Sequence, residues 1–309
     1  MKKIIKILII CFAAFFAAGL LMLGYYTLEN KSNVTVTEYT VKSEKVKNEL
    51  TVIQLSDLHG NEIGRDNSII CEKVKKIKPD LILMTGDMFS RSGDGFGETL
   101  SLIEGLSGSA PIYYSLGNHE DDYYCYNNED NKEAMSFEIE KRGATILEHE
   151  YEDITVNGSP IRLGGFFGYS IDPDPAYFEK IQSEGYFDSW RYDTVWNSGA
   201  DDAFLKKFAM TDRFTLLMCH VPDSFILLSG FEIYNADLIL SGHLHGGQIH
   251  LPLAGPVFAP NQGLFPEKAY GAFFDDDTAI IISRGLGSGK IIPRINNTPE
   301  ICQIKVLPQ

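Results

Sequence analysis

Five apolar runs, each followed at once by a short polar signature, constrain the fold of this chain more than any other feature. The runs are rich in β-branched and aromatic residues, as buried strands are. Side chains at the carboxyl ends of parallel strands meet in one crevice, so we expect the signatures to converge there. They are Asp57-Leu58-His59, Gly86-Asp87, Gly117-Asn118-His119-Glu120, Cys219-His220 and Gly242-His243-Leu244-His245.

The converging side chains combine imidazole, carboxylate and amide groups, which indicates a metal site and favours two metals. A lone histidine after a strand is more often a surface or capping residue, but five of the seven histidines fall within these signatures. The mixed donors suit Mn, Fe, Zn or Ni better than Mg or Ca alone. No cysteine pair has zinc-finger spacing. The candidate ligands are Asp57, His59, Asp87, Asn118, His220, His243 and His245.

The order of these signatures, D-x-H, G-D, G-N-H-E, H and G-H-x-H, resembles that of the calcineurin-like metallophosphoesterases. The resemblance runs from about Leu50 to the end of the chain. Two segments are similar to a membrane-associated branch of that family. Some members of this branch, and of a related one, resemble phosphodiesterases of the UDP-2,3-diacylglucosamine pyrophosphatase type. The two segments are Gly242-His243-Leu244-His245-Gly246-Gly247-Gln248-Ile249 and Ser283-Arg284-Gly285-Leu286-Gly287.

The resemblance implies two groups of three ligands joined by the bridging carboxylate of Asp87. Two divalent cations held close together lower the pKa of a water between them and clamp phosphoryl oxygens for in-line attack. His119 is the candidate general acid, and a hydrogen bond to a ligand is its alternative role. Glu120 is expected to orient imidazoles. The groups are Asp57, His59 and His245 for the first metal, and Asn118, His220 and His243 for the second.

The resemblance also implies the fold class, an α/β four-layer αββα sandwich with two central mixed β-sheets flanked by helices. It would occupy residues 49–309 as one phosphoesterase domain. Helical spacing of apolar residues predicts helices over about 67–78, 97–106 and 132–142, and late strands are expected over 279–283 and 301–306. Alternation of strands and helices is typical of parallel strands with crossover helices.

The first 28 residues differ in kind from the rest. Lysines precede an uncharged run over 7–26, which at ~1.5 Å per residue matches the ~30 Å hydrocarbon core of a bilayer. We expect a transmembrane helix over 1–28, with a cytoplasmic N-terminus and an extracytoplasmic catalytic domain. A cleaved signal peptide is the alternative, although no small-x-small site follows the run. A linker and an edge strand are expected over 29–48.

A long aromatic insertion over about 170–212 separates two of the expected strands. It holds both tryptophans, Trp190 and Trp196, and is either a cap that binds substrate or a cover for one sheet edge. Arg284, flanked by glycines, would either neutralise a substrate phosphate or form a structural salt bridge. The net charge of −15 disfavours nucleic acid as a partner.

The expected function is hydrolysis of a phosphoester that depends on two divalent metal ions and proceeds by attack of a hydroxide between them. A phosphodiesterase or pyrophosphatase acting on lipid-linked or nucleotide-like esters fits the resemblance best. The alternatives are a phosphomonoesterase or protein phosphatase, and a non-catalytic membrane-tethered binding protein. The presence of His119 beside a full ligand set argues against the last of these.

Overall fold

The computed structural model describes most of the chain, namely residues 2–127, 129–167, 199–226, 235–260, 262–275, 278–288 and 294–309. The expected aromatic insertion lies outside the described residues from its start to residue 198. Trp190 and Trp196 are among the residues not described, so their predicted role stays a prediction.

The first sheet has six strands and carries three of the five signatures. Strands β2, β3, β4 and β5 run parallel, and β16 joins them antiparallel to β2. The first strand, β1, pairs parallel with β16 at the sheet edge, as expected for an edge strand. The order is β1 (Thr35–Ser43), β16 (Glu300–Pro308), β2 (Leu50–Leu55), β3 (Leu81–Thr85), β4 (Ile112–Ser115) and β5 (Ala144–Ile146).

The second sheet, also of six strands, carries the other two signatures. Its four inner strands run parallel, whereas β14 and β6 are antiparallel edges. The order is β14 (Gly271–Asp275), β15 (Thr278–Ile282), β9 (Leu238–Ser241), β8 (Phe214–Cys219), β7 (Ser159–Phe166) and β6 (Glu150–Val156).

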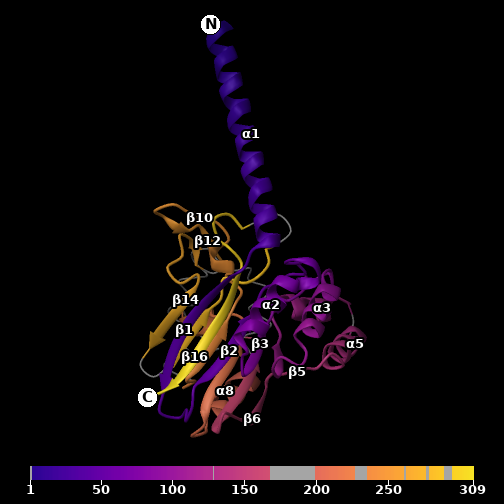
Figure 1. Ribbon diagram of the computed structural model, residues 1–309, viewed down its shortest axis with the longest axis vertical. Helices are drawn as coiled ribbons and strands as arrows, with labels where there is room; N and C mark the ends of the chain where they lie inside the picture. Colours follow the sequence, from indigo (N-terminus) through magenta and orange to yellow (C-terminus); the bar gives the residue numbers. More distant parts are fainter. Residues whose placement is uncertain are drawn as a thin grey trace.

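Alternating side chains divide each parallel strand between two cores. In β3, Leu81 and Leu83 belong to the core between the sheets, while Ile82 and Met84 pack under helices on the outer face. The outer helices of the first sheet are α2 (Ser68–Ile77), α3 (Phe96–Leu106) and α5 (Glu129–Glu140), and α8 (Gly199–Ala209) packs on the second (Figure 1). Two mixed sheets flanked by helices are therefore confirmed.

Most expected elements are present, with ends that differ by a few residues. The helix α4 (Asn118–Asn127) was not expected from the sequence, and neither were two small hairpins that follow the last signature. The hairpins are β10 (His250–Leu251) with β11 (Gly255–Pro256), and β12 (Phe258–Ala259) with β13 (Gly263–Leu264). The short remaining helices are η1 (Arg65–Asn67), α9 (Asp223–Ile226) and η2 (His245–Gly247).

The N-terminal segment is a helix, α1 (Lys2–Ser32), which projects from one end of the two-sheet body (Figure 1). It continues past residue 28 into the expected linker. Considering the described residues alone, none of the helices combines the length and the apolarity of a membrane span, so the transmembrane helix expected over 1–28 is not detected. The cysteines described as free thiols are Cys11, Cys71, Cys219 and Cys302.

Candidate metal centre

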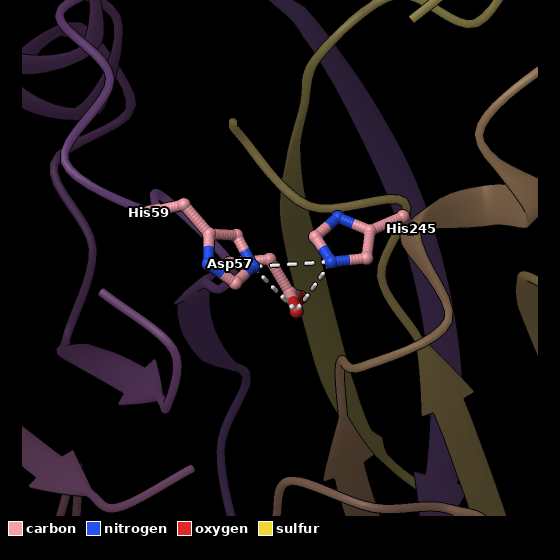
Figure 2. A group of neighbouring side chains, drawn as sticks. All are labelled: Asp57, His59 and His245. Atoms are coloured by element: carbon pink, nitrogen blue, oxygen red, sulfur yellow. Dashed lines mark hydrogen bonds and ion pairs between the residues drawn. The ribbon is translucent and has the colours of Figure 1, made fainter. Parts of the chain in front are cut away.

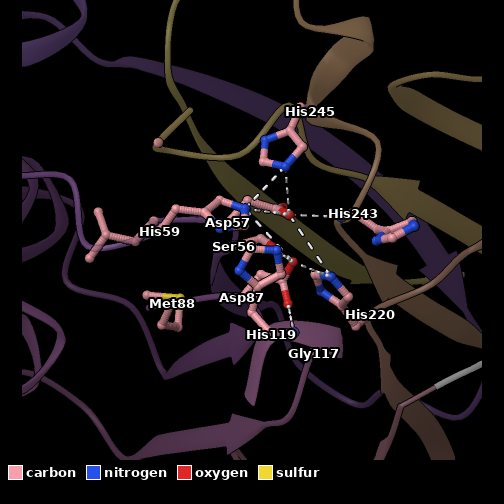
Figure 3. A network of polar contacts seen from close by, with 12 residues as sticks. Ser56, Asp57, His59, Asp87, Met88, Gly117, His119, His220, His243 and His245 are labelled. Carbon is pink, nitrogen blue, oxygen red and sulfur yellow. Dashed lines mark hydrogen bonds and ion pairs between the residues drawn. The ribbon is translucent and has the colours of Figure 1, made fainter. Parts of the chain in front are cut away.

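The polar signatures meet at the carboxyl ends of strands from both sheets, as the alternation of strands and helices predicted (Figure 3). The ends of β2, β3 and β4 supply the ligand candidates of the first sheet, and those of β8 and β9 supply the rest. Among the residues that the structure describes, three overlapping groups have ligand atoms within 4.8 Å of one another. They are Asp57, His59 and His245; His59, Asp87 and His119; and Asp87, His220 and His243.

Figure 2 shows the first group, in which two imidazoles face one carboxylate. The Nε2 atoms of His59 and His245 are 3.1 Å apart. They lie 4.0 and 3.8 Å, respectively, from Oδ1 of Asp57. Two imidazole nitrogens this close to one buried carboxylate form a donor set that suits one divalent cation.

Asp87 lies between the groups, as the resemblance implied for a bridging carboxylate. Its Oδ2 is 3.7 Å from Nε2 of His59, in the first group, and 3.3 Å from Nε2 of His220, in the third. Asp87 has only 2% of its surface exposed. One oxygen therefore faces ligand candidates of both groups.

Burial keeps most of the imidazoles neutral, which is the form that binds a metal. It lowers the pKa of His59 and of His245 to about 3, and that of His243 well below its ordinary value. Burial also favours a neutral His220, but the charge of Asp87 beside it outweighs this and raises its pKa to about 9. Burial by itself raises the pKa of Asp87, yet the surrounding imidazoles, above all His220, hold it well below its usual range.

Hydrogen bonds direct particular atoms toward the centre. Nδ1 of His220 lies 2.7 Å from the carbonyl oxygen of Thr85, which acts as acceptor, so Nε2 is the nitrogen that points at Asp87. Two buried polar atoms at the centre, Asp57 Oδ2 and Asn118 Oδ1, make no hydrogen bond with any residue that the structure describes. Buried polar atoms are seldom left unpaired. These atoms therefore fit a centre that binds divalent cations.

The backbone at the ligand candidates is strained. Left-handed φ angles are uncommon outside glycine, yet Asp57 has φ 52°, Asp87 has φ 53° and His243 has φ 69°. His59 and His245 adopt the same region. Such strain costs of order 1–3 kcal/mol per residue and is typical of functional sites, where the surrounding structure enforces it.

Two glycines of the signatures are required by close approach. A Cβ at Gly117 would lie 2.3 Å from Oδ1 of Asp87, and one at Gly242 would lie 2.0 Å from Oγ of Ser56. In both cases the backbone of one loop packs directly against a side chain that follows a different strand. This explains why glycine precedes the ligands in these signatures.

Glu120 is fully buried and holds the loops rather than the imidazoles, which corrects its expected role. Its carboxylate accepts hydrogen bonds from the backbone N–H groups of Asp87, Met88 and Gly117, at 2.8, 2.8 and 2.9 Å. The hydroxyl of Tyr114 donates a fourth, at 2.7 Å. The loop after β3 is therefore fixed against the loop after β4.

Arg294 supports the backbone of the centre and was not identified from the sequence. Its fully buried guanidinium donates from Nε to the carbonyl oxygen of Gly287, at 2.6 Å, and from Nη1 to that of His245, at 3.2 Å. The side chain of Asn297 donates to the same His245 carbonyl at 2.8 Å. Neither residue belongs to a motif, so no local signal marks them.

Arg284 lies against Glu300 and Tyr270, a placement that fits its structural alternative. Its backbone N–H donates to the Glu300 carboxylate at 2.9 Å, and its guanidinium lies 4.4 Å from the centroid of the Tyr270 ring. The neighbouring glycine motif has a separate role. The N–H groups of Leu286 and Gly287 donate to the carbonyl oxygens of Ser56 and Asp57 and support the first ligand turn.

His119 lies at the rim of the centre. Its side chain is 20% exposed, whereas that of His220 is fully buried, and its Nε2 is 3.9 Å from Oδ2 of Asp87. Its backbone N–H donates to Oδ1 of the same carboxylate at 2.8 Å. The imidazole is thus held close to the candidate ligands and still meets solvent.

Replacing Asp87 tests the two-metal arrangement directly. We expect Asp87→Asn to weaken binding of divalent cations by more than about 100-fold, because removing even an outer hydrogen-bond partner of a ligand costs 10–100-fold. Metal content after dialysis and calorimetric titration measure the effect. The matched control is Asp66→Asn, the same change on an exposed side chain. Retention of two ions at wild-type affinity by Asp87→Asn would rule out the bridging role.

Comparison with known proteins places this geometry in a family. The family model described as "Calcineurin-like phosphoesterase" matches residues 50–247. The uncharacterized metallophosphoesterase YkuE of Bacillus subtilis is 26% identical over 290 residues, which are 90% of this chain and 87% of the relative. The UDP-2,3-diacylglucosamine pyrophosphatase LpxG of Chlamydia trachomatis is 28% identical over 286 residues, 84% of each chain.

Among solved structures, the phosphopantetheinyl hydrolase PptH of Mycobacterium tuberculosis superposes with a TM-score of 0.45 at 16% identity, covering 77% of this chain and 89% of that one. The family match spans most of the chain and includes every candidate ligand, and the histidine and aspartate candidates lie in groups that suit two metal ions. The chain belongs to the calcineurin-like phosphoesterase family, and it is a metallophosphoesterase, a hydrolase of phosphoric esters.

Proposed function

We propose that this enzyme is a two-metal phosphodiesterase or pyrophosphatase whose substrates are lipid-linked or nucleotide-like esters at a membrane. The observation that carries the two-metal proposal is the position of Asp87, whose Oδ2 faces His59 on one side and His220 on the other. The substrate class is supported by the similarity to LpxG, a relative named as a pyrophosphatase of a UDP-linked diacyl sugar.

The proposed ligand sets divide the centre in two around Asp87. When bound, two divalent cations supply an activated water and a positive clamp on the phosphoryl oxygens. The donor atoms suit Mn, Fe, Zn or Ni, as proposed from the sequence. The first set is Asp57, His59 and His245, which lie in one group of neighbouring ligand atoms. The second set takes His220 and His243 from another group and adds Asn118, as the family resemblance implies.

The chain's own residues prepare the centre for a phosphoester. Burial keeps His59, His243 and His245 neutral, so their nitrogens hold free electron pairs. His220 would hold a metal through Nε2 after that nitrogen has given up the proton that its raised pKa retains. His119, at the rim, is positioned to give a proton to the leaving-group oxygen.

The two alternatives to this function are a phosphomonoesterase or protein phosphatase and a non-catalytic binding protein. On the metal-loaded full chain, we expect kcat/KM for diesters and pyrophosphates to exceed that for matched monoesters by at least about tenfold, which corresponds to ~1.4 kcal/mol of transition-state discrimination. Assays with UDP-linked lipid pyrophosphate, an aryl diester and an aryl monoester measure the ratio. A preference for monoesters would favour the phosphatase alternative.

The role of His119 is tested by the leaving group. Poor alkyl leaving groups need a proton, whereas aryl groups leave without one. We therefore expect His119→Asn to slow alkyl diesters about 10²–10⁴-fold and aryl diesters far less. The matched control is His149→Asn, the same change at an exposed histidine outside the centre. Equal slowing of both esters would instead assign His119 to holding a ligand in place.

Attachment to a membrane through the N-terminal segment, with the catalytic domain outside the cytoplasm, is proposed from the sequence. Lys2, Lys3 and Lys6 precede the uncharged run and mark the cytoplasmic side. Protease added to intact, wall-stripped cells should therefore digest the catalytic domain and spare cytoplasmic controls. Protection of the domain, or its recovery as a soluble cleaved form, would contradict this topology.

A further inference from the structure

Two small hairpins beside the metal centre carry large apolar side chains that face solvent. We call residues 249–260 and 262–265 the double hairpin; it comprises β10 to β13 and follows His245 within a few residues. Isolated exposed apolar residues are ordinary, but a concentration of them in one short segment marks an interaction surface. The exposed fractions are Leu251 44%, Leu253 109%, Phe258 52%, Leu264 69% and Phe265 55%.

The double hairpin also lacks charge. No Asp, Glu, Lys or Arg occurs between Gly246 and Pro266, in a chain of which 22% is charged. Surfaces that face water normally intersperse charges of both signs. An uncharged surface with exposed leucine and phenylalanine instead suits an apolar partner.

The turns of the double hairpin hold apolar residues in a conformation that usually belongs to glycine. Leu253 has φ 70° and Phe265 has φ 57°. Glycine or asparagine occupies such positions at little cost, whereas leucine and phenylalanine are strained there. Because both side chains are exposed, packing within the chain does not offset this strain. A partner that buries them would.

The double hairpin lies at the end of the body from which α1 projects (Figure 1). The side chain of Asn30, in the last turns of α1, donates to the carbonyl oxygen of Arg294 at 3.1 Å. The next residue, Ile295, bridges to Ile249 and accepts the N–H of His250 at 2.9 Å. One short segment therefore joins the bases of α1 and the double hairpin. The helix exposes apolar side chains of its own, such as Phe12 at 72% and Leu21 at 76%.

We propose that the double hairpin docks on a lipid bilayer and inserts Leu251, Leu253 and Leu264 among the acyl chains at the headgroup boundary. This rests on the proposed membrane location of the enzyme and names the surface that makes the contact. A second copy of the chain is a poorer occupant, because two chains of net charge −15 repel each other. An apolar tip without charge gains from acyl chains and gains nothing from anionic headgroups.

Docking in this way would orient the metal centre. The double hairpin begins four residues after His245, whose side chain is 19% exposed at the centre. Insertion of the hairpin tips would hold the His245 side of the metal centre at the headgroup layer. A phosphoester joined to a lipid would then reach the centre without leaving the bilayer.

The test uses the full chain with one tryptophan added at a hairpin tip, Leu253→Trp or Leu264→Trp. The protein is floated with phosphatidylcholine vesicles, with or without brominated acyl chains, which quench tryptophan only on contact. After subtraction of wild-type emission, we expect the added emission of either variant to fall at least about twofold in brominated vesicles. The effect should not change between about 0.1 and 1 M salt, because no charges are involved.

The matched control is Met210→Trp, which adds the same residue at a site 79% exposed, before β8 at the opposite end from the metal centre. Its emission should not respond to bromine. Wild-type metal content and unchanged hydrolysis of a soluble aryl diester show that each variant is folded.

Failure to float, or equal responses at both hairpin positions and Met210, would overturn the proposal. The added tryptophan emission could instead be unaffected by bromine and change with the density of protein on the vesicles. That result would assign the surface to a second copy of the chain and would also overturn the proposal. Because quenching requires no hydrolysis, a preference for soluble esters would refute the proposed substrate class and leave this measurement intact.

Discussion

Two buried carboxylates, those of Asp57 and Asp87, are the constraint on which the rest of the structure depends. Their exposed fractions are 0% and 2%, and a buried carboxylate without compensation costs several kcal/mol. The compensation comes from distant parts of the chain. The backbone N–H of His243, after β9 of the second sheet, donates to Asp57 of the first at 2.9 Å. The sheets must therefore stack in one register for either charge to be tolerated.

The loops that hold these two carboxylates have a strained backbone, and hydrogen bonds keep that backbone in place. The ligand turns adopt left-handed backbone angles, and Glu120 ties two of them together through three backbone amides. Burial, and then the charge of Asp87, raises the pKa of Glu120. This carboxylate is stabilised by its four hydrogen-bond donors. The positions of the ligand turns thus depend on Glu120, which is not itself a candidate ligand.

The centre also requires the last part of the chain. Strand β16, which holds residues 300–308, lies between β1 and β2 and brings the C-terminal region back into the first sheet. On the way there, Arg294 and Asn297 bond to the carbonyl oxygen of His245. Contacts separated by so much sequence form late, because the entropy of closing long loops opposes them. The backbone of His245 is therefore held by residues that follow it by about fifty positions.

The candidate ligands could be found from sequence because each follows a run with a strong strand pattern, and parallel strands deliver their carboxyl ends to one edge. Asp57, Asp87 and His220 could be identified in this way. The outer helices could be identified from the spacing of their apolar residues, which is a local pattern. Arg294 and Glu120 were missed or misassigned because nothing near them in sequence reveals their partners. Those partners are backbone groups of other loops. Residue order thus decided which groups could reach the centre, whereas the stacking of two sheets decided their distances and charges, because electrostatic shifts depend on burial and spatial neighbours.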